Sequence, residues 1–251
     1  MARRVRLDKF MVDKGLAPSR QRAQELIRAG QVRVDGIPRD RPATQVSPGA
    51  HVKLEGPGLA FVSRGGHKLA HALDHFQVSP DGRTCADLGA STGGFTDCLL
   101  QRGAARVFAI DVGYGQLDWS LRSDDRVVVM ERTNARHLEG LPEPVDLVVG
   151  DLSFISLRLI LPAIQRFAEP GAECVLLIKP QFEAGPEGLR RGGVVRDDAT
   201  RQAAIDRVVE EARALGLDVR GTVPSPIAGA RSGNVEELVH LFLPPEAPCD
   251  P

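Results

Sequence analysis

A glycine-rich segment lies between two acidic residues, and the spacing of the three is typical of a site that binds a small ligand. Asp87 ends an apolar run and is followed by the sequence GASTGGF at residues 89–95, which is typical of a strand that turns into a helix. Such a turn presents backbone N–H groups and a helix N-terminus to a ligand. Asp111 lies 22 positions after Gly89, where a carboxylate can accept hydrogen bonds from ribose hydroxyls. The pattern predicts a nucleoside-binding site.

The charge beside the turn indicates which nucleoside-containing ligand binds. The glycine spacing differs from the G-x-G-x-x-G of dinucleotide-binding proteins. Asp87 would repel a pyrophosphate, but its carboxylate suits a cationic ligand. An amino acid joined to a nucleoside through a sulfonium fits this arrangement better than NAD does. We therefore expect S-adenosylmethionine, with NAD as the alternative.

Two motifs in this region, Asp87-Leu88-Gly89-Ala90 and Ile110-Asp111-Val112-Gly113, resemble the cofactor motifs of class I methyltransferases. The resemblance implies that Asp87 and Gly89 lie beside the methionine portion of the cofactor, and that Asp111 binds its ribose. It also places Asn134 at the adenine end. The residues expected in the cofactor site are Asp87, Gly89, Ala90, Ser91, Thr92, Gly93, Gly94, Phe95, Asp111, Val112, Asn134 and Asp151.

A second group of polar residues consists of Lys68, Asp151, Lys179 and Glu236. Asp151 and Lys179 each follow an apolar run, so we expect both at the carboxyl ends of central strands, facing the ligand crevice. Burial disfavours the ammonium form of a lysine, which makes Lys179 a candidate general base for a hydroxyl nucleophile. The second lysine would act in the same direction and the two carboxylates in the opposite one, so the sequence leaves the net effect open.

The order Lys…Asp…Lys…Glu on a methyltransferase fold resembles the RrmJ/FtsJ type of ribose 2′-O-methyltransferase. From end to end, the chain resembles the TlyA-type rRNA methyltransferases, a family that also carries the older name haemolysin. The motifs that carry this match are VSRGGHKL at 62–69, DVGYGQL at 111–117, GDLSFIS at 150–156, IKPQFE at 178–183 and SGNVE at 232–236.

This resemblance implies that Lys68, Asp151, Lys179 and Glu236 form a catalytic tetrad. It further implies that the substrate is a cytidine ribose in the rRNA of one ribosomal subunit or of both. Direct attack of a ribose hydroxyl, with Lys179 as the base, requires no metal, so we expect none. Because Glu237 directly follows Glu236, the fourth position stays open between these two glutamates.

Alternating apolar and amphipathic runs predict the elements that position these residues. Runs at 84–88, 107–110, 127–130, 145–149 and 174–178 are short, rich in β-branched residues and apolar on both faces, as buried parallel strands are. Helices are expected near 94–102, 154–167 and 198–215, and closing strands at 217–223 and 238–243. The fold predicted for residues 63–243 is therefore α/β, a Rossmann-like class I methyltransferase domain with a doubly wound, mostly parallel sheet.

Residues 1–55 predict a small α/β domain that precedes the methyltransferase-like domain in the sequence. A helical apolar pattern starts at Leu7, Ser19 can cap a second helix, and a strand at 32–34 is followed by the Asp35-Gly36 turn and a further strand at 51–54. These segments resemble the S4 RNA-binding domain over nearly its whole length. The resemblance implies that the second helix and the following hairpin present basic residues to RNA. The residues expected to bind RNA are Arg6, Arg20, Arg22, Arg28, Arg33 and Arg64.

The distribution of charge supports this interpretation. Residues 1–60 hold 12 Lys and Arg against 6 Asp and Glu, whereas the whole chain has a net charge of −1. Arg20, Gln24 and Arg28 recur every four residues and therefore share one helix face, which can bind phosphates with little reading of sequence. The alternative is an ordinary exposed basic helix. The resemblance to the TlyA-type methyltransferases implies ribosomal RNA or a ribosomal subunit as the partner.

The remaining features favour a cytoplasmic protein. Cysteines 85, 98, 174 and 249 form no C-x-x-C pair, which indicates reduced thiols and neither a disulfide framework nor a zinc site. No apolar run is long enough to span a bilayer, and the N-terminus lacks the apolar stretch of a secretory signal, so no membrane partner is expected. Residues 56–62 predict a linker and residues 244–251 a disordered tail. Nothing in the sequence requires an oligomer.

Three other functions compete with methyl transfer. A non-enzymatic RNA-binding or ribosome-assembly factor predicts a broken cofactor turn or an incomplete tetrad, and the sequence has neither. A pore-forming cytolysin, which the older family name suggests, predicts a signal or a membrane-active segment, and none is visible. A pseudouridine synthase can also carry an S4 domain, but the Asp-Leu-Gly-Ala turn favours a methyl-donor site.

Overall fold

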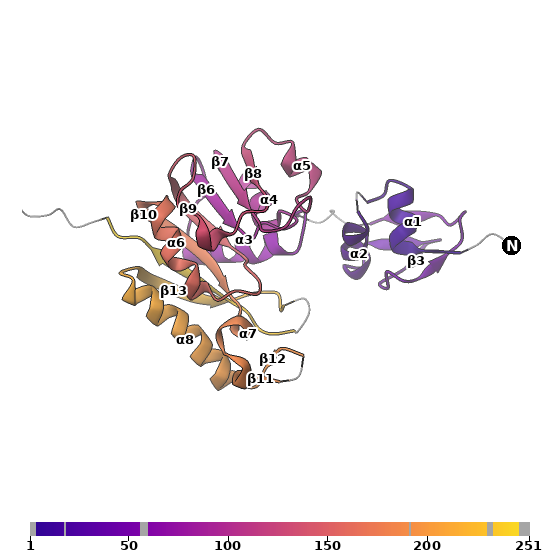
Figure 1. The fold of residues 1–251 in the computed structure, drawn as a ribbon. Coiled ribbons are helices and arrows are strands. Elements are labelled where there is room, and N and C mark those ends of the chain that lie inside the picture. Colours follow the sequence, from indigo (N-terminus) through magenta and orange to yellow (C-terminus); the bar gives the residue numbers. More distant parts are fainter. Residues whose placement is uncertain (1–3, 18, 56–59, 191, 230–232, 246–251) are drawn as a thin grey trace, which may run out of the picture. The chain divides into compact units, whose positions relative to one another are not determined.

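The chain divides at Ser63, where one structural unit ends and a second begins with Arg64. The computed structural model describes residues 4–17, 19–55, 60–190, 192–229 and 233–245 (Figure 1). The first four residues of the predicted linker, 56–59, lie outside the described residues, as do residues 246–251 of the predicted tail. Each unit has its own buried apolar core.

The first unit packs two helices against short antiparallel strands. Helices α1 (Leu7–Asp13) and α2 (Arg20–Arg28) confirm the two predicted helices, and the hydroxyl of Ser19 accepts the N–H of Arg22 at 3.2 Å as the expected cap. Strand β2 (Val32–Val34) pairs with β3 (Ile37–Pro38) and β5 (Val52–Leu54), and β1 (Val5–Arg6) pairs with β4 (Gln45–Val46). The buried core consists of Leu7, Phe10, Met11, Ala17, Ala23, Leu26, Ile27, Val32, Val34 and Val46.

A buried carboxylate in α1 joins charged residues of this unit. The side chain of Asp8 has no exposed surface, and it accepts hydrogen bonds from Arg6 at 2.8 and 3.0 Å, from Gln24 at 2.9 Å and from Arg20 at 3.2 Å. These bonds, those from Arg6 first, hold the pKa of Asp8 well below its usual range. Arg20 and Gln24, which share one face of α2, therefore converge on the same acceptor.

The second unit is built on a seven-stranded sheet of order β13-β14-β10-β9-β6-β7-β8 (Figure 1). Five strands are parallel: β6 (Thr84–Leu88), β7 (Arg106–Ile110), β8 (Val127–Met130), β9 (Val145–Gly150) and β10 (Ala168–Ile178). Strand β14 (Glu237–Phe242) runs antiparallel to both β10 and β13 (Asp218–Pro224). The chain moves outward from β6 to β8 and then returns to β9 on the other side of β6, which opens a crevice at the carboxyl ends of these strands. The predicted fold class is confirmed.

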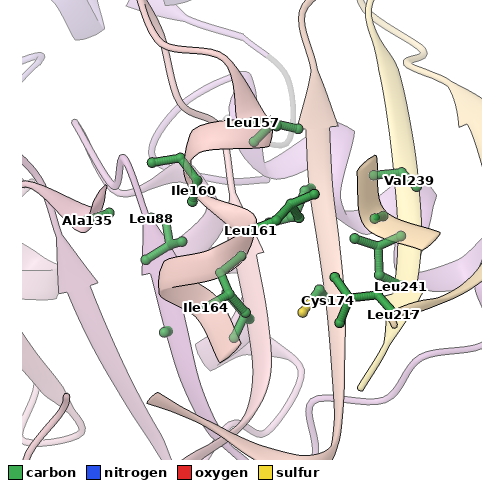
Figure 2. Close-up of a cluster of buried hydrophobic side chains, with 14 of the residues drawn as sticks. Leu88, Ala135, Leu157, Ile160, Leu161, Ile164, Cys174, Leu217, Val239 and Leu241 are labelled. Atoms are coloured by element: carbon green, nitrogen blue, oxygen red, sulfur yellow. The ribbon is translucent and has the colours of Figure 1, made fainter. Parts of the chain in front are cut away.

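Helices cover both faces of this sheet. On one face, α6 (Leu161–Phe167) and α8 (Asp198–Ala214) bury apolar side chains against alternate residues of the strands. Figure 2 shows Leu161 and Ile164 of α6 in this cluster with Leu88 and Cys174 of the sheet. The alternate strand residues that do not join this cluster point to the opposite face of the sheet. There, α3 (Gly65–Phe76) contacts β10 and β13. On the same face, α4 (Gly94–Gln101) contacts β6 and β7.

One predicted helix is wrong over its first half. The helix expected over 154–167 begins at Leu161, because residues 151–156 form a loop and Ser156 caps a short 3-10 turn, η2 (Leu157–Leu159), ahead of it. Helix α3 was not predicted as a helix because it starts with two glycines and has no side-chain cap. The hairpin of β11 (Leu189–Arg190) and β12 (Val194–Val195) was also not predicted, since two-residue strands carry no periodic signal.

The cysteines agree with the sequence-based expectation as far as they are described. Cys85, Cys98 and Cys174 are buried free thiols, and Cys249 lies outside the described residues. Among the helices that the structure describes, none combines the length and the apolar character needed to cross a membrane.

Replacing Asp8 by Asn should loosen the first unit. Without the charge that pairs with Arg6 and Arg20, we expect a loss of about 2 kcal/mol in the free energy of unfolding at pH 7. Because the pKa of Asp8 is depressed in the folded state, this contribution is fully present above the unfolded value near 3.8, begins to decline there, and is lost only as the pH falls through the lower folded value. Calorimetry of the full chain from pH 7 to pH 3, with hydrogen exchange over residues 7–28, measures the effect.

The matched control for this experiment is Asp13→Asn on the exposed end of the same helix. It should leave the free energy of unfolding within about 0.5 kcal/mol of wild type. Equal protection of residues 7–28 in wild type and Asp8→Asn at pH 7 would contradict the anchoring role.

Candidate active site

The glycine-rich turn lies at the carboxyl end of β6, between the ends of two neighbouring strands. The N–H groups of Gly89 and Ala90 donate to the carbonyl of Ile110 at the end of β7, at 2.8 and 3.1 Å. On the other side, the carbonyl of Leu88 accepts the N–H of Asp151 at 3.0 Å, directly after β9. The turn is therefore fixed to both neighbouring strands at the point where the strand order reverses.

Two glycines make this close approach possible. Gly89 has a φ of +82°, and a Cβ at this position would lie 3.1 Å from the carbonyl oxygen of Asp151. Gly93 has a φ of +94°, and a Cβ there would lie 2.2 Å from the side chain of Leu121. A side chain would meet backbone strain at both positions; at Gly89 it would also press on the backbone of Asp151, whereas at Gly93 the side chain of Leu121 would have to move. Helix α4 begins directly after Gly93, with its N-terminus at the turn, as the sequence predicted.

Asp87 is fully buried beneath this turn. Its Oδ2 accepts the N–H of Thr96 at 2.9 Å and the hydroxyl of Thr96 at 2.7 Å, whereas Oδ1 is buried and has no hydrogen-bond partner among the described residues. Burial raises the pKa of Asp87 to about 7, the bonds from Thr96 oppose the shift, and the carboxylates of Asp151 and Asp111 add to it. A cation bound next to Asp87 would favour its ionised form.

A pocket opens beside Asp111, at the ends of β7 and β8. The carboxylate of Asp111 is fixed by two backbone donors, the N–H of Ser91 at 2.8 Å and the N–H of Gly113 at 2.6 Å. Glu131 stands directly after β8 as Asp111 does after β7, and it accepts the N–H of Gly115 at 2.8 Å. The pocket is lined by Ala90, Ser91, Ala109, Asp111, Gly113, Gln116, Leu117, Val129 and Glu131.

Several of these lining residues were missed by the sequence analysis. Glu131 directly follows the apolar run at 127–130, so its position at a strand end was a usable signal. Gln116 and Leu117 belong to a motif that was noted without a role for either residue. Thr96, which binds Asp87, had no signal beyond its place in the first turn of α4.

Other residues predicted for the cofactor site lie outside the pocket lining. The side chain of Val112 is exposed, and that of Phe95 is buried in α4. Asn134 caps a short 3-10 turn, η1 (Ala135–His137), by accepting the N–H of Arg136 at 3.0 Å. Thr92, Gly93 and Gly94 shape the turn itself. Contact of all these residues with a cofactor stays a prediction.

The residues present fit S-adenosylmethionine. Oδ1 of Asp87, buried and without a hydrogen-bond partner in the described part of the chain, suits a cationic ligand. The carboxylates of Asp111 and Glu131 offer acceptors for ribose hydroxyls. The apolar side chains of Leu117 and Val129 offer a surface for a flat base. A pyrophosphate would be repelled by the same carboxylates, which disfavours NAD.

Next to this turn, the structure brings the four predicted tetrad residues together. Nζ of Lys68 in α3 lies 2.5 Å from Oε2 of Glu236 and 3.8 Å from Oδ2 of Asp151. Nζ of Lys179, which follows β10, lies 2.6 Å from Oδ1 of Asp151. The side chains of both lysines are 10% exposed. The four residues form a continuous series of alternating charge, which leaves neither buried ammonium unpaired.

The structure distinguishes Glu236 from its neighbour. Glu237 is the first residue of β14 and lies 3.8 Å from Arg201. Burial raises the pKa of Glu237 above its ordinary value. Because successive residues of an extended chain point to opposite sides, Glu236 contacts Lys68 and Glu237 does not.

Ser153 is a further polar neighbour of the tetrad. Its Oγ accepts a hydrogen bond from Nζ of Lys179 at 2.7 Å. Ser153 lies within the motif at 150–156, but its type and spacing gave no reason to select it. The contact depends on how the loop after β9 folds over Lys179.

The predicted RNA-binding arginines differ in their surroundings. Nη1 of Arg22 donates to the carbonyls of Phe61 and Val62 at 2.8 and 2.7 Å, and its side chain is 17% exposed. Arg22 therefore holds the end of the linker against α2. Arg64 belongs to the second unit, at the N-terminus of α3.

The other four arginines lie in the first unit and have partly or fully exposed side chains. Arg6 and Arg20 pair with Asp8, and Arg33 pairs with Glu55. Arg28 donates to the side chain of Gln24 at 3.2 Å on the same face of α2. These contacts fix the direction of each arginine. Their binding to RNA stays a prediction.

Comparison with known proteins agrees with this geometry. Residues 61–242 match the family model of FtsJ-like methyltransferases, and residues 5–52 match that of the S4 domain. The chain is 53% identical to the 16S/23S rRNA (cytidine-2'-O)-methyltransferase TlyA of Mycobacterium tuberculosis, over 96% of this chain and 91% of that protein. It is 38% identical to Hemolysin A of Brachyspira hyodysenteriae, over 95% of this chain and 100% of that protein.

A solved structure from Streptococcus thermophilus, described as a proposed hemolysin, superposes with a TM-score of 0.76 at 40% sequence identity. The match covers 99% of this chain and 93% of that chain. The similarity therefore extends over both units and includes the segments that carry all four tetrad residues.

Glu236 and Glu237 provide a matched test of whether Glu236 pairs with the buried ammonium of Lys68. Glu236→Gln leaves the ammonium of Lys68 without its 2.5 Å partner, so we expect a loss of about 3 kcal/mol in the free energy of unfolding. For a chain of this size, this loss lowers the thermal midpoint by roughly 10 °C. Glu237→Gln removes a carboxylate whose charge is already disfavoured by burial, and should lower the midpoint far less. Equal midpoints for the two variants would contradict the pairing.

Proposed function

The chain belongs to the FtsJ-like methyltransferase family and carries an S4 domain, and we propose that it methylates the 2′-oxygen of a cytidine ribose in ribosomal RNA, with S-adenosylmethionine as the methyl donor. One observation carries the proposal: Lys179, Asp151, Lys68 and Glu236 form a connected series directly beside the glycine-rich turn. The TlyA relative is named for the same reaction on 16S and 23S rRNA, which supports this substrate class for the present chain.

In this proposal, Lys179 is the general base. Its Nζ is held by Oδ1 of Asp151 at 2.6 Å and by Oγ of Ser153 at 2.7 Å. In its neutral form, this amine takes the proton from the ribose 2′-hydroxyl as the oxygen forms its new bond to carbon. When bound, S-adenosylmethionine would supply a methyl group on a sulfonium sulfur, and that sulfur would be left as a neutral thioether.

The other tetrad residues keep the base and the hydroxyl in place. Lys68 contacts Oδ2 of Asp151 at 3.8 Å, and Glu236 holds Lys68 at 2.5 Å. Asp151 is thereby fixed from two sides and orients both Lys179 and the substrate hydroxyl. Correct placement of the reacting atoms contributes about 7–11 kcal/mol in well-oriented systems, and base assistance adds roughly 10²–10⁴-fold in rate.

The arginines of the first unit would bind the RNA backbone. Arg6, Arg20, Arg28 and Arg33 carry charge on partly exposed side chains of α2 and its neighbouring elements. Arg64 adds a basic side chain at the N-terminus of α3. Contacts of this kind position an RNA by its phosphates and leave the choice of nucleotide to the active site. Arg22 contributes indirectly, by holding Phe61 and Val62.

Transfer of labelled methyl from S-adenosylmethionine to purified 30S and 50S subunits tests this function. We expect label at a ribose linkage that resists alkali. Lys179→Ala should lower the rate at least about 10²-fold while the cofactor still binds, because the base is lost and the pocket beside Asp111 is not. Label on one subunit or on both identifies the substrate.

The matched control for this variant is Lys179→Arg. Arginine retains a positive charge that pairs with Asp151, but it does not act as a base near neutral pH. Loss of transfer in both variants supports the base assignment, and normal turnover in either one contradicts it. Cofactor binding without label on any rRNA would point to another methyl acceptor. Absence of cofactor binding would favour a ribosome-assembly factor.

The cofactor site should respond to pH through Asp87. With its pKa raised to about 7, Asp87 is largely protonated at pH 6 and ionised at pH 8. If the cationic cofactor binds the ionised form, its affinity for wild type rises about tenfold over this interval. Asp87→Asn should bind more weakly at pH 8 and lack this part of the pH dependence.

Calorimetric titration of both proteins with the same ligand measures the effect of Asp87. Titration of the ligand's own amino group affects wild type and variant alike, so the difference between the two profiles isolates the carboxylate. Parallel profiles from pH 6 to pH 8 would contradict the role of Asp87 in cofactor binding.

A further inference from the structure

Glu183 is a buried carboxylate that the proposed mechanism does not use. It is the last residue of α7 (Pro180–Glu183), a single helical turn that begins directly after Lys179. Its side chain is 1% exposed. A carboxylate is costly to bury unless hydrogen bonds satisfy it, so its partners indicate what it holds in place.

The side-chain partners of Glu183 come from the segment that follows β9. Its Oε2 accepts the hydroxyl of Ser156 at 2.5 Å, and its Oε1 accepts the N–H of Leu157 at 2.8 Å. Nε of Arg158 lies 3.6 Å from Oε2. Ser156 in turn caps η2 by accepting the N–H of Arg158 at 3.2 Å. The carboxylate therefore fixes the end of the loop at 151–156 and the start of η2.

The same two segments meet at three further points. Nζ of Lys179 contacts Oδ1 of Asp151 at 2.6 Å and Oγ of Ser153 at 2.7 Å. The rings of Phe154 and Phe182 lie 5.3 Å apart between their centroids. The contacts follow one another in order along both segments, from Lys179 at one end to Glu183 at the other. The loop and α7 are thus joined along their length.

The loop needs an anchor because its backbone is strained. Phe154 has a φ of +65°, in the left-handed region that a bulky side chain disfavours. The N–H of Asp151 fixes the start of the loop to the carbonyl of Leu88 at 3.0 Å. Glu183 fixes the other end. Strained residues persist where the surrounding contacts hold them, and these two anchors lie on either side of Phe154.

We infer that Glu183 is a positioning residue, which holds the loop at 151–156 so that Asp151 and Ser153 both contact Nζ of Lys179. The inference deepens the proposed function and rests on it, since it concerns the geometry of that same reaction. Glu183 acts through Ser156 and Leu157, because its own carboxylate is buried and is bonded to these two residues.

Glu183→Gln is the direct test. The amide retains one acceptor oxygen and nearly the same shape, but it loses the charge and places an NH₂ group beside Ser156 or Leu157. We expect kcat for rRNA methylation to fall about 10- to 100-fold, as misplacement of a catalytic group does. KM for S-adenosylmethionine should change less than about twofold, because the pocket beside Asp111 is built from the ends of β6, β7 and β8.

Two variants of Ser156 separate the hydroxyl from the shape of the side chain. Ser156→Ala should lower kcat as Glu183→Gln does, and the double variant should lower it no further than the more severe single variant. Ser156→Thr keeps the hydroxyl and should retain at least half of wild-type kcat. A loss of kcat in the double variant equal to the product of the two single losses would overturn the inference.

Val145→Ala controls for a general loss of stability. Val145 is fully buried at the start of β9, at the opposite end of the strand that leads into the loop. Its truncation should lower the thermal midpoint and leave kcat within about twofold of wild type. If kcat falls in Val145→Ala as far as in Glu183→Gln at a similar midpoint, the effect of Glu183 is structural and the inference is overturned.

Hydrogen exchange of the free protein provides a measurement that does not depend on activity. In Glu183→Gln, the backbone amides of residues 151–159 should exchange at least about tenfold faster than in wild type, and that of Leu157 should change most. The exchange rates of the amides of α4 should stay the same. Unchanged exchange at Leu157 would overturn the inference. If wild type methylates no rRNA, the proposed function fails, and the exchange result still shows whether Glu183 holds the loop.

Discussion

Lys68 is a buried cation, and its requirement for counter-charges constrains the geometry of the whole site. Its partners come from distant parts of the chain: Glu236 precedes β14, and Asp151 follows β9. A buried ammonium that lacks a partner costs several kcal/mol, so α3 is stable on the sheet in the position where Lys68 reaches both carboxylates. Asp151, fixed in this way, sets the position of Lys179 on its other side.

The reversal of strand order divides the site into two halves that meet at the glycine-rich turn. Strands β6, β7 and β8 carry Asp87, Asp111 and Glu131 at their carboxyl ends, on the side of the turn where we propose that the cofactor binds. Strands β9, β10 and β14 present the tetrad. The turn is hydrogen-bonded to the end of β7, and Leu88 directly before it is hydrogen-bonded to Asp151 after β9, so the methyl donor and the base would be held on one frame. Because the turn is fixed to both halves, a displacement of either strand end would change the distance between donor and base.

The parts of the structure that the sequence predicted have strong local signals. The five parallel strands are apolar on both faces because both are covered by helices, and this made them recognisable. The expected helix over 154–167 was wrong because Phe154 and Ile155 have the apolar character of a helix but belong to the loop that covers Lys179. Thr96, Ser153 and Glu183 were not selected from the sequence, since each is an ordinary residue type whose contact, with Asp87, Lys179 and Ser156 in turn, forms only in the folded chain.

The sequence by itself determined which residues stand at the ends of the strands, since apolar runs set the strand boundaries and parallel strands bring their carboxyl ends to one edge. On that basis Asp87, Asp111, Asp151 and Lys179 could be assigned to one crevice. The tertiary structure decided which side chains pair there. In the folded chain, Glu236 and not Glu237 pairs with Lys68. Arg22, expected to bind RNA, donates to the carbonyls of Phe61 and Val62 at the end of the linker. Such choices depend on the direction of each side chain and on the charges that burial brings together, and neither is encoded in spacing along the chain.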